Sequence, residues 1–230
     1  MRTSRTTPVP EGRTRWRRFG IAAGLTSALA GGLVYLAATG ALAVSFAMSG
    51  IPFTLSASQM TGDDFIQYAM PDKVSHPDAS GLISADSWQT AANQDTYVAA
   101  TVTRLSSAKI YDLHQTVCAP IPDPLGAILP KKNLLVTILA GGGGNPATAS
   151  NMVVDAPLMQ AGSAEFTNIN IGQDLGDALG GNLNGNFAQN ADSVVIKDLR
   201  QVAIGTTAGT FKLTGLDVSA TFVSSCPKPE

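Results

Sequence analysis

Charged residues are scarce in this chain of 230 residues, where they make up 14%, and aromatic residues make up only 6%. A typical globular domain is about 25% charged. The basic residues are also unevenly placed: residues 1–43 hold six arginines and one acidic residue, so residues 44–230 carry a net charge of −7. Phosphate contacts need clustered Lys and Arg, so the acidic residues 44–230 argue against nucleic acid as a partner. At this length a single globular domain is the default expectation.

No charge interrupts the thirty residues Phe19–Met48, which follow the arginine-rich start. A helix of this length could span a bilayer, which needs about 20 residues. Ala41-Leu42-Ala43 is also the small-x-small pattern of a signal-peptidase site, and the residues after it alternate as a strand does. We therefore expect residues 1–43 to be a basic segment with a signal peptide, the favoured interpretation, or with a membrane-anchor helix.

Export follows from either interpretation. Positive charge ahead of the apolar run places residues 44–230 in the extracellular space or at the outer face of the cytoplasmic membrane. The chain has only two cysteines, Cys118 and Cys226. An even count in an exported domain predicts a disulfide between them, and the alternative is two unrelated buried thiols.

Amphipathic helix patterns of twelve residues are missing after residue 44. The chain instead shows short alternating runs separated by Gly, Asn, Asp and Pro, at Phe53–Ala57, Val98–Val102, Leu134–Leu139, Phe166–Ile171, Val194–Ile196 and Phe211–Phe222. Strict alternation indicates strands with one buried face. The sequence predicts one all-β domain, a short β-solenoid or a β-sandwich, preceded by the N-terminal signal or anchor helix. Residues 71–94 and 172–192 are expected to be loops, with at most a short helix around Asp177–Leu179.

A weak internal repeat supports this architecture. Ser107–Gln115 matches Ser193–Gln201 at Ser, Ile, Asp, Leu and Gln, and a shorter core recurs at Asn170–Gln173. Repeated strand units suggest stacked rungs or two similar halves of a sandwich. Alternatively, a strand that ends in this way simply suits a turn. His114 stands at the variable position of the repeat, where the second copy has Arg200, so we expect it to face solvent.

The usual marks of catalysis are absent. The chain has no Gly-x-Ser-x-Gly, and its two histidines, His76 and His114, have no motif around them. Ser106 and Lys109 have the Ser-x-x-Lys spacing, but in a strand these positions point to opposite faces. Gly141–Gly144 could present backbone N–H groups to an anion, yet the flanking residues of an esterase loop or a P-loop are missing, and we expect a tight turn. No metal-ligand spacing is found, so we expect neither a metal nor a cofactor.

Several segments together resemble a known family. They are Gly40–Phe46, Phe53–Ala57, Phe166–Asp174 and Thr207–Leu216, of which the last two are the most specific. In these the chain resembles a family of exported proteins of high-GC Gram-positive bacteria, uncharacterised in function and often labelled cholesterol esterase. The resemblance spans nearly the whole chain, implies export, and brings no catalytic residues.

Two classes of function compete. The favoured class is a non-catalytic cell-envelope protein that binds an apolar ligand, such as a lipid or sterol-like molecule, or a membrane partner. The ligand would lie between sheet faces, although the same residues suit an ordinary core. These residues are Phe53, Leu55, Phe166, Ile169, Phe211, Leu213 and Leu216.

The second class is a lipid or sterol ester hydrolase, as the family label implies. It would need Ser106 or Ser107 to be activated by His114. In one extended strand Ser106 and His114 are about 26 Å apart, at about 3.3 Å per residue, so the chain would have to fold back between them.

Overall fold

The computed structural model describes residues 51–74, 82–83, 86, 88–121, 123–179 and 187–227. The chain divides into two units, Met1–Ala41 and Leu42–Glu230, and the described residues all belong to the second. The expected signal or anchor segment and His76 lie outside the described residues. In the described part of the chain, no helix has the length and apolarity needed to cross a membrane.

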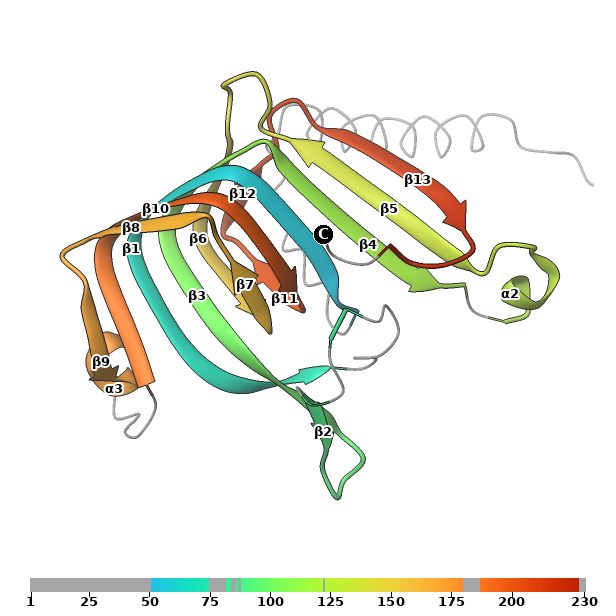
Figure 1. Cartoon of the computed structure of the whole chain (residues 1–230), viewed down its shortest axis with the longest axis horizontal. Helices are drawn as coiled ribbons and strands as arrows, with labels where there is room; N and C mark the ends of the chain where they lie inside the picture. Colours follow the sequence, from blue (N-terminus) through green and yellow to red (C-terminus); the bar gives the residue numbers. More distant parts are fainter. Residues whose placement is uncertain are drawn as a thin grey trace, which may run out of the picture. The chain divides into compact units, whose positions relative to one another are not determined.

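The described residues form one antiparallel sheet with two short helices (Figure 1). The strands are β1 (Phe53–Val74), β2 (Trp88–Thr90), β3 (Thr96–Tyr111), β4 (Leu113–Pro120), β5 (Asn133–Ala140), β6 (Ala147–Ala156), β7 (Leu158–Gln160), β8 (Ser163–Thr167), β9 (Asn170–Asp174), β10 (Phe187–Ala203), β11 (Gly205–Thr207), β12 (Thr210–Lys212) and β13 (Asp217–Val223). The helices are α2 (Leu125–Ile128) and α3 (Leu175–Leu179).

β1 organises the sheet by pairing along both of its edges. On one edge it pairs with β4 and β3 in a single register, so that Phe53 lies opposite Val117 and Val74 opposite Thr96. β3 then pairs with β6 and β4 with β5, and beyond these β6 pairs with β11 and β12, and β5 with β13. On the other edge β1 pairs with β10, which pairs in turn with β7, β8 and β9.

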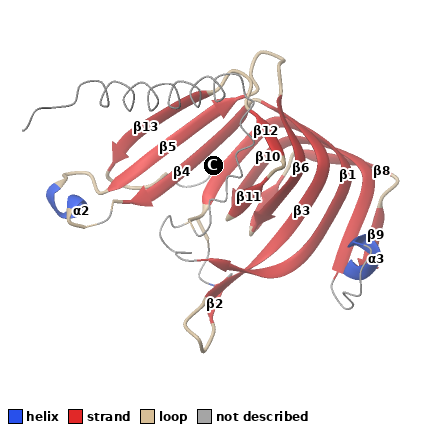
Figure 2. Ribbon diagram, turned by 180° about the vertical axis from the view of Figure 1, so that it is seen from behind, coloured by secondary structure: helices blue, strands red, loops and turns tan. Residues whose placement is uncertain are grey.

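The chain connects the two flanks of the sheet, because β10, which pairs with β1, leads through Ile204 into β11, which pairs with β6. The sheet is therefore strongly curled, and β4, β5 and β13 extend beside the curl as a three-stranded wing (Figures 1 and 2). We call these three strands the wing.

The all-β prediction is confirmed, and the finer architecture differs from both alternatives. All strands pair antiparallel within one curled sheet, which is neither a stack of solenoid rungs nor two facing sheets. Each predicted strand run overlaps a strand, and α3 occupies the position of the predicted short helix. The loop predictions were partly wrong: residues 71–94 include the end of β1 and β2, and residues 172–192 include parts of β9 and β10.

Left-handed residues explain both the curl and the broken alternation in the sequence. Asp112 and Asp198, with φ of 50° and 52°, lie on either side of Ser58 of β1, and Ser58 Oγ donates a 2.6 Å hydrogen bond to Asp112 Oδ2. Asp112 and Asp198 thus mark one line that runs across the strands at Ser58. A second such line includes Asp64 of β1 and Asn151 of β6, with φ of 50° and 46°. Asp and Asn adopt this conformation more readily than other non-Gly residues.

The buried side of β1 changes at each line. Phe53, Leu55 and Ala57 are buried before Ser58, whereas Met60 is buried after it, and Phe65 is buried after the second line. Each line therefore moves the buried positions by one residue, so a long strand appears in the sequence as several short runs.

The internal repeat flanks β1. Ser107–Gln115 and Ser193–Gln201 lie on opposite edges of β1 in the same register, so that Met60 is opposite Ile110 on one side and Ile196 on the other. The repeated Asp provides the bend on both sides. The repeat thus marks two equivalent neighbours of one central strand, and not stacked rungs.

The main core fills the inner face of the curled sheet. It draws on β1, β3, β6 and β10, and Phe65, which is 2% exposed, packs its ring 5.2 Å from that of Phe166. A smaller core includes Val98, Val202 and Ile204.

Asp155 of β6 places an acidic group beside this smaller core, opposite Gly205 of β11. Burial, and next the charge of Asp72, raise the pKa of Asp155 from 3.8 to about 6. Between about pH 4 and pH 6 the folded state binds a proton that the unfolded state has lost, so stability falls as the pH rises through this window. Because solvent screens this half-buried carboxylate, its ionisation lowers the free energy of unfolding by only about 1 kcal/mol.

Asp155→Asn should therefore raise the free energy of unfolding by about 1 kcal/mol at pH 7.5 and leave it nearly unchanged at pH 4. Urea unfolding at the two pH values measures this, with the exposed Asp86→Asn as the control. An equal gain at both pH values, or a loss at pH 7.5, would contradict the assignment.

Candidate functional site

The residues predicted to line a ligand face lie mostly in the core. Phe53 and Leu55 are buried, the others except Leu216 are half-buried against the main core, and Leu216 is 44% exposed. As placed, the half-buried residues serve packing; they are Phe166, Ile169, Phe211 and Leu213. Leu55 also borders the groove described next.

A groove of about 440 Å³ lies between the wing and the strands β1, β10 and β7. We call it the His114 groove. It is lined by Thr54, Leu55, Ser56, His114, Thr116, Leu135, Thr137, Leu158, Gln160, Arg200, Gln201, Val202 and Pro227. Its volume lies within the range of about 300–1,000 Å³ that is usual for small-molecule sites.

Two neighbouring rows of side chains form its floor. In the first row Ser56 has His114 on one side and Arg200 on the other, and Gln160 follows Arg200. In the second row Thr54 has Thr116 on one side and Val202 on the other. Thr137 follows Thr116, and Leu158 follows Val202, at the two ends of this row. The rows are two residues apart on each strand, so their side chains point to the same face of the sheet.

The first row places an imidazole and a guanidinium group on the two sides of a hydroxyl group. His114 and Arg200 stand two strands apart, about 10 Å between backbones, so both side chains can reach one ligand group above Ser56. His114 Nε2 lies 3.4 Å from the hydroxyl of Thr116, and Arg200 has no carboxylate partner among the described residues. Asp217 is the nearest carboxylate in the same row and lies beyond Leu139.

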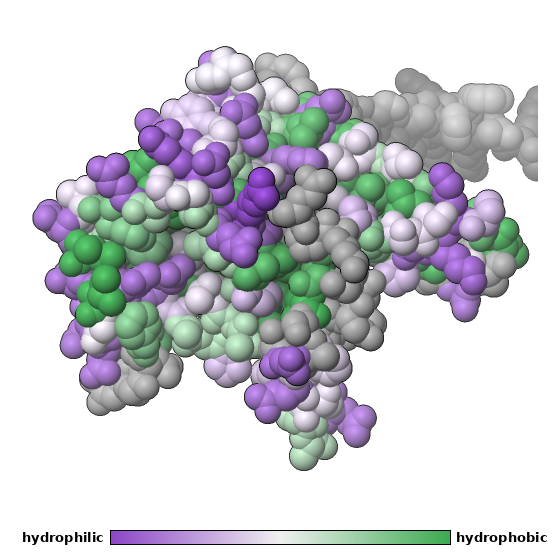
Figure 3. Space-filling model, viewed as in Figure 1, coloured by the Kyte–Doolittle hydropathy of each residue, from purple (hydrophilic) through white to green (hydrophobic). Residues whose placement is uncertain are grey.

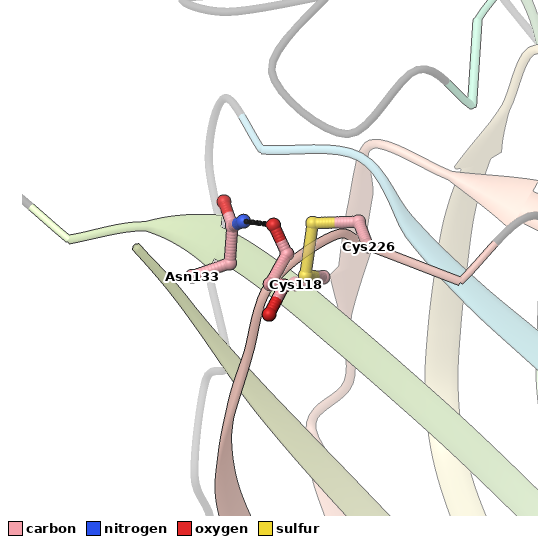
Figure 4. The surroundings of a disulfide bond; sticks show 4 residues. Cys118, Asn133 and Cys226 are labelled. Atoms are coloured by element: carbon pink, nitrogen blue, oxygen red, sulfur yellow. Dashed lines mark hydrogen bonds between the residues drawn. A yellow bond between two sulfur atoms is a disulfide. The ribbon is translucent and has the colours of Figure 1, made fainter. Parts of the chain in front are cut away.

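The disulfide holds the C-terminal tail of the chain at the edge of the groove. Cys118 of β4 is joined to Cys226, with 5.7 Å between their Cα atoms, so the predicted disulfide is present (Figure 4). Asn133 Nδ2 donates a 3.1 Å hydrogen bond to the carbonyl of Ser224, which holds the same tail against β5. Pro227, the residue after Cys226, borders the groove.

The serines of the hydrolase hypothesis do not meet His114. Ser107 Oγ donates a 2.6 Å hydrogen bond to Asp63 Oδ2, and Ser106 Oγ donates to the Asp63 carbonyl at 3.2 Å. The chain from Ser106 to His114 stays paired with β1 and does not fold back. Ser56 is instead the serine directly opposite His114, with Cβ atoms about 5 Å apart in such a pair.

His114 is exposed, as predicted, and so is Arg200. Sequence analysis missed that the two share one row, because β1 brings together the two copies of the repeat from opposite edges. The one available signal was the repeat itself, in which His114 and Arg200 hold equivalent positions.

The glycine turn and a second hollow were the other candidate sites. Gly141–Gly144 form a turn between β5 and β6 in which Asn145 N–H donates to the Gly142 carbonyl at 3.3 Å, as expected of a tight turn. A hollow of about 570 Å³ lies near Trp88 and Tyr97, at the end of β1. Within the described residues no group of three or more His, Cys, Asp or Glu is placed to hold a metal ion.

Comparison with known proteins places the chain in a family. Searches of curated proteins and of solved structures each found no match. The model of a family of unknown function, DUF6230, matches residues 49–227, and the chain therefore belongs to this family.

Proposed function

We propose that the protein is an exported cell-envelope protein that binds a lipid or sterol-like ligand with an anionic group, without catalysing a reaction on it. The observation that carries the proposal is the row of His114, Ser56 and Arg200 on the floor of a groove that leucine side chains also line. The anionic group would lie on this row, and the apolar part of the ligand would lie against Leu135 and Leu158.

Export is supported by the arginine-rich start, the uncharged run Phe19–Met48 and the disulfide between Cys118 and Cys226. Disulfides persist in oxidising compartments and are rare in the cytosol. An exported domain would meet the ligand at the membrane surface or within the envelope.

The chemistry of Arg200 favours an anion. A guanidinium group offers a planar fork of donors that fits a carboxylate or a phosphate in a bidentate manner. Thr54, Thr116 and Ser56 add hydroxyl donors next to it. Since residues 44–230 carry a net charge of −7, the field of the whole domain repels anions, and binding would depend on these local contacts.

Loss of Arg200 tests the proposal. Arg200→Gln should weaken the binding of a fluorescent long-chain fatty acid to the full-length protein about tenfold, because a hydrogen bond to a charged group contributes about 1.5 kcal/mol or more. The same probe with an uncharged alcohol in place of the carboxylate should bind both proteins equally. Fluorescence titration in mild detergent measures both affinities.

Lys197→Gln is the matched control, because Lys197 is an exposed cation on the same strand, β10, and outside the groove. It should bind the fatty acid as the wild type does. Equal weakening by both substitutions would show a non-specific charge effect, and no weakening by Arg200→Gln would overturn the proposed site.

An ester hydrolase is the second candidate, and the observation that favours it is the Ser56–His114 pair. A serine opposite a histidine has the elements of a nucleophile and its base. Catalytic histidines of this kind are oriented by a third group, usually a carboxylate. The imidazole of His114 instead lies within hydrogen-bond distance of the Thr116 hydroxyl, at 3.4 Å. This difference favours binding over hydrolysis.

A further inference from the structure

The outer edge of the wing offers backbone groups for pairing. β13 pairs with β5 along its whole length, from Asp217 opposite Leu139 to Val223 opposite Asn133. Its other edge pairs with no strand of the described chain (Figure 2). Such an edge carries a row of unpaired N–H and C=O groups that can add a further strand.

β13 also lacks the devices that usually protect an edge. It contains no Pro and no Lys, and its one charge, Asp217, stands at its first position. Val218 and Phe222 are 55% and 51% exposed on one face of the strand. By comparison, β2, β7, β11 and β12 have three residues each, and β8 carries Glu165. An unprotected edge of this kind is a template on which another strand can pair.

The sequence of β13 is complementary to itself when it is read antiparallel. If Ala220 lies opposite its own copy, Val218 lies opposite Phe222, and Ser219 lies opposite Thr221. This register puts apolar residues beside apolar ones on one face and the hydroxyl groups of Ser219 and Thr221 beside each other on the other face, as favourable cross-strand pairs require. At the two ends of the pair Asp217 lies opposite Val223. A two-fold axis through Ala220 relates the two strands.

We propose that β13 pairs with β13 of a second copy of this chain, in the register centred on Ala220. The two wings then form one continuous sheet across the dimer. Val218 and Phe222 adjoin Ile138 and Leu134 of β5, so the apolar face continues from one wing to the other. Hydrophobic residues reach the surface over the wing, where they are seen among hydrophilic ones in Figure 3.

A cysteine at the axis tests the register. Ala220→Cys should form a disulfide between two chains, because residues directly opposite in an antiparallel pair have Cα atoms about 4.5–5.5 Å apart, within reach of a disulfide. Val218→Cys is the control: it is exposed on the same strand, but its own copy lies four positions further along, about 13 Å away. Non-reducing electrophoresis of the full-length protein in mild detergent should show a covalent dimer for Ala220→Cys alone.

The uncross-linked protein gives a second measurement. Light scattering of the full-length wild type in the same detergent should show a dimer, and Phe222→Lys should shift it to a monomer with an unchanged circular dichroism spectrum. Equal cross-linking of both cysteine variants, a monomeric wild type, or a dimer that persists in Phe222→Lys would overturn the proposal. The last outcome would assign dimerisation to another surface, such as one that a membrane or the N-terminal segment provides.

Discussion

Replacing Cys118 and Cys226 together by alanine is expected to lower the free energy of unfolding by about 4 kcal/mol, in the chain-entropy account of disulfides. The two residues are 108 positions apart, so the bond closes a long loop and removes many conformations from the unfolded chain. It also ties the C-terminal tail to β4, at the end of the groove.

Urea unfolding of the double variant and of the reduced wild type should give the same loss. Thiol counting of the denatured, unreduced protein provides the control and should find no free cysteine. A loss below 1 kcal/mol would mean that the bond contributes little, and two free thiols would remove the disulfide from the account.

Gly141→Ala is expected to cost about 3 kcal/mol, the second largest effect, because two penalties combine at this position. Gly141 has a φ of 75°, in the left-handed region. A Cβ atom there would also lie 2.5 Å from the Ile110 carbonyl oxygen and 2.9 Å from the Ala147 nitrogen, both of which are backbone atoms of neighbouring strands. The turn cannot open without breaking the pairing of β3 with β6.

Gly143→Ala separates the two penalties. Gly143 has a φ of 64° in the same turn, and a Cβ atom there would meet nothing within 4 Å. Its replacement should cost only the backbone term, about 1 kcal/mol. Urea unfolding of the two variants measures the difference, and equal losses would show that the close approach at Gly141 is not a constraint on the fold.

The fold class could be predicted from the sequence because alternation is local. Phe53–Ala57 shows it plainly, and Leu134–Leu139 is a short, mostly apolar run; both lie in strands. The path of the strands could not be predicted, because the Asp and Asn residues that usually mark turns lie here within strands. Asp64 and Asn151 bend their strands without ending them, so one long strand looked like several short ones.

The candidate site depends on register, and register is a property of the whole sheet. His114 and Arg200 are 86 positions apart in the sequence and lie in one row only because each pairs with Ser56. A shift of one residue on either side of β1 would turn one of them to the other face. The disulfide was predictable because the chain has two cysteines, which allow one pairing only.

Incubation of the wild-type protein with a nitrophenyl ester of a long-chain fatty acid and with a cholesteryl ester distinguishes binding from hydrolysis. After separation from unbound lipid, we expect the protein to retain the ester intact, with no nitrophenol or cholesterol released above the buffer control. Steady release of product that is abolished in His114→Ala would contradict the account and assign the His114 groove to a hydrolase.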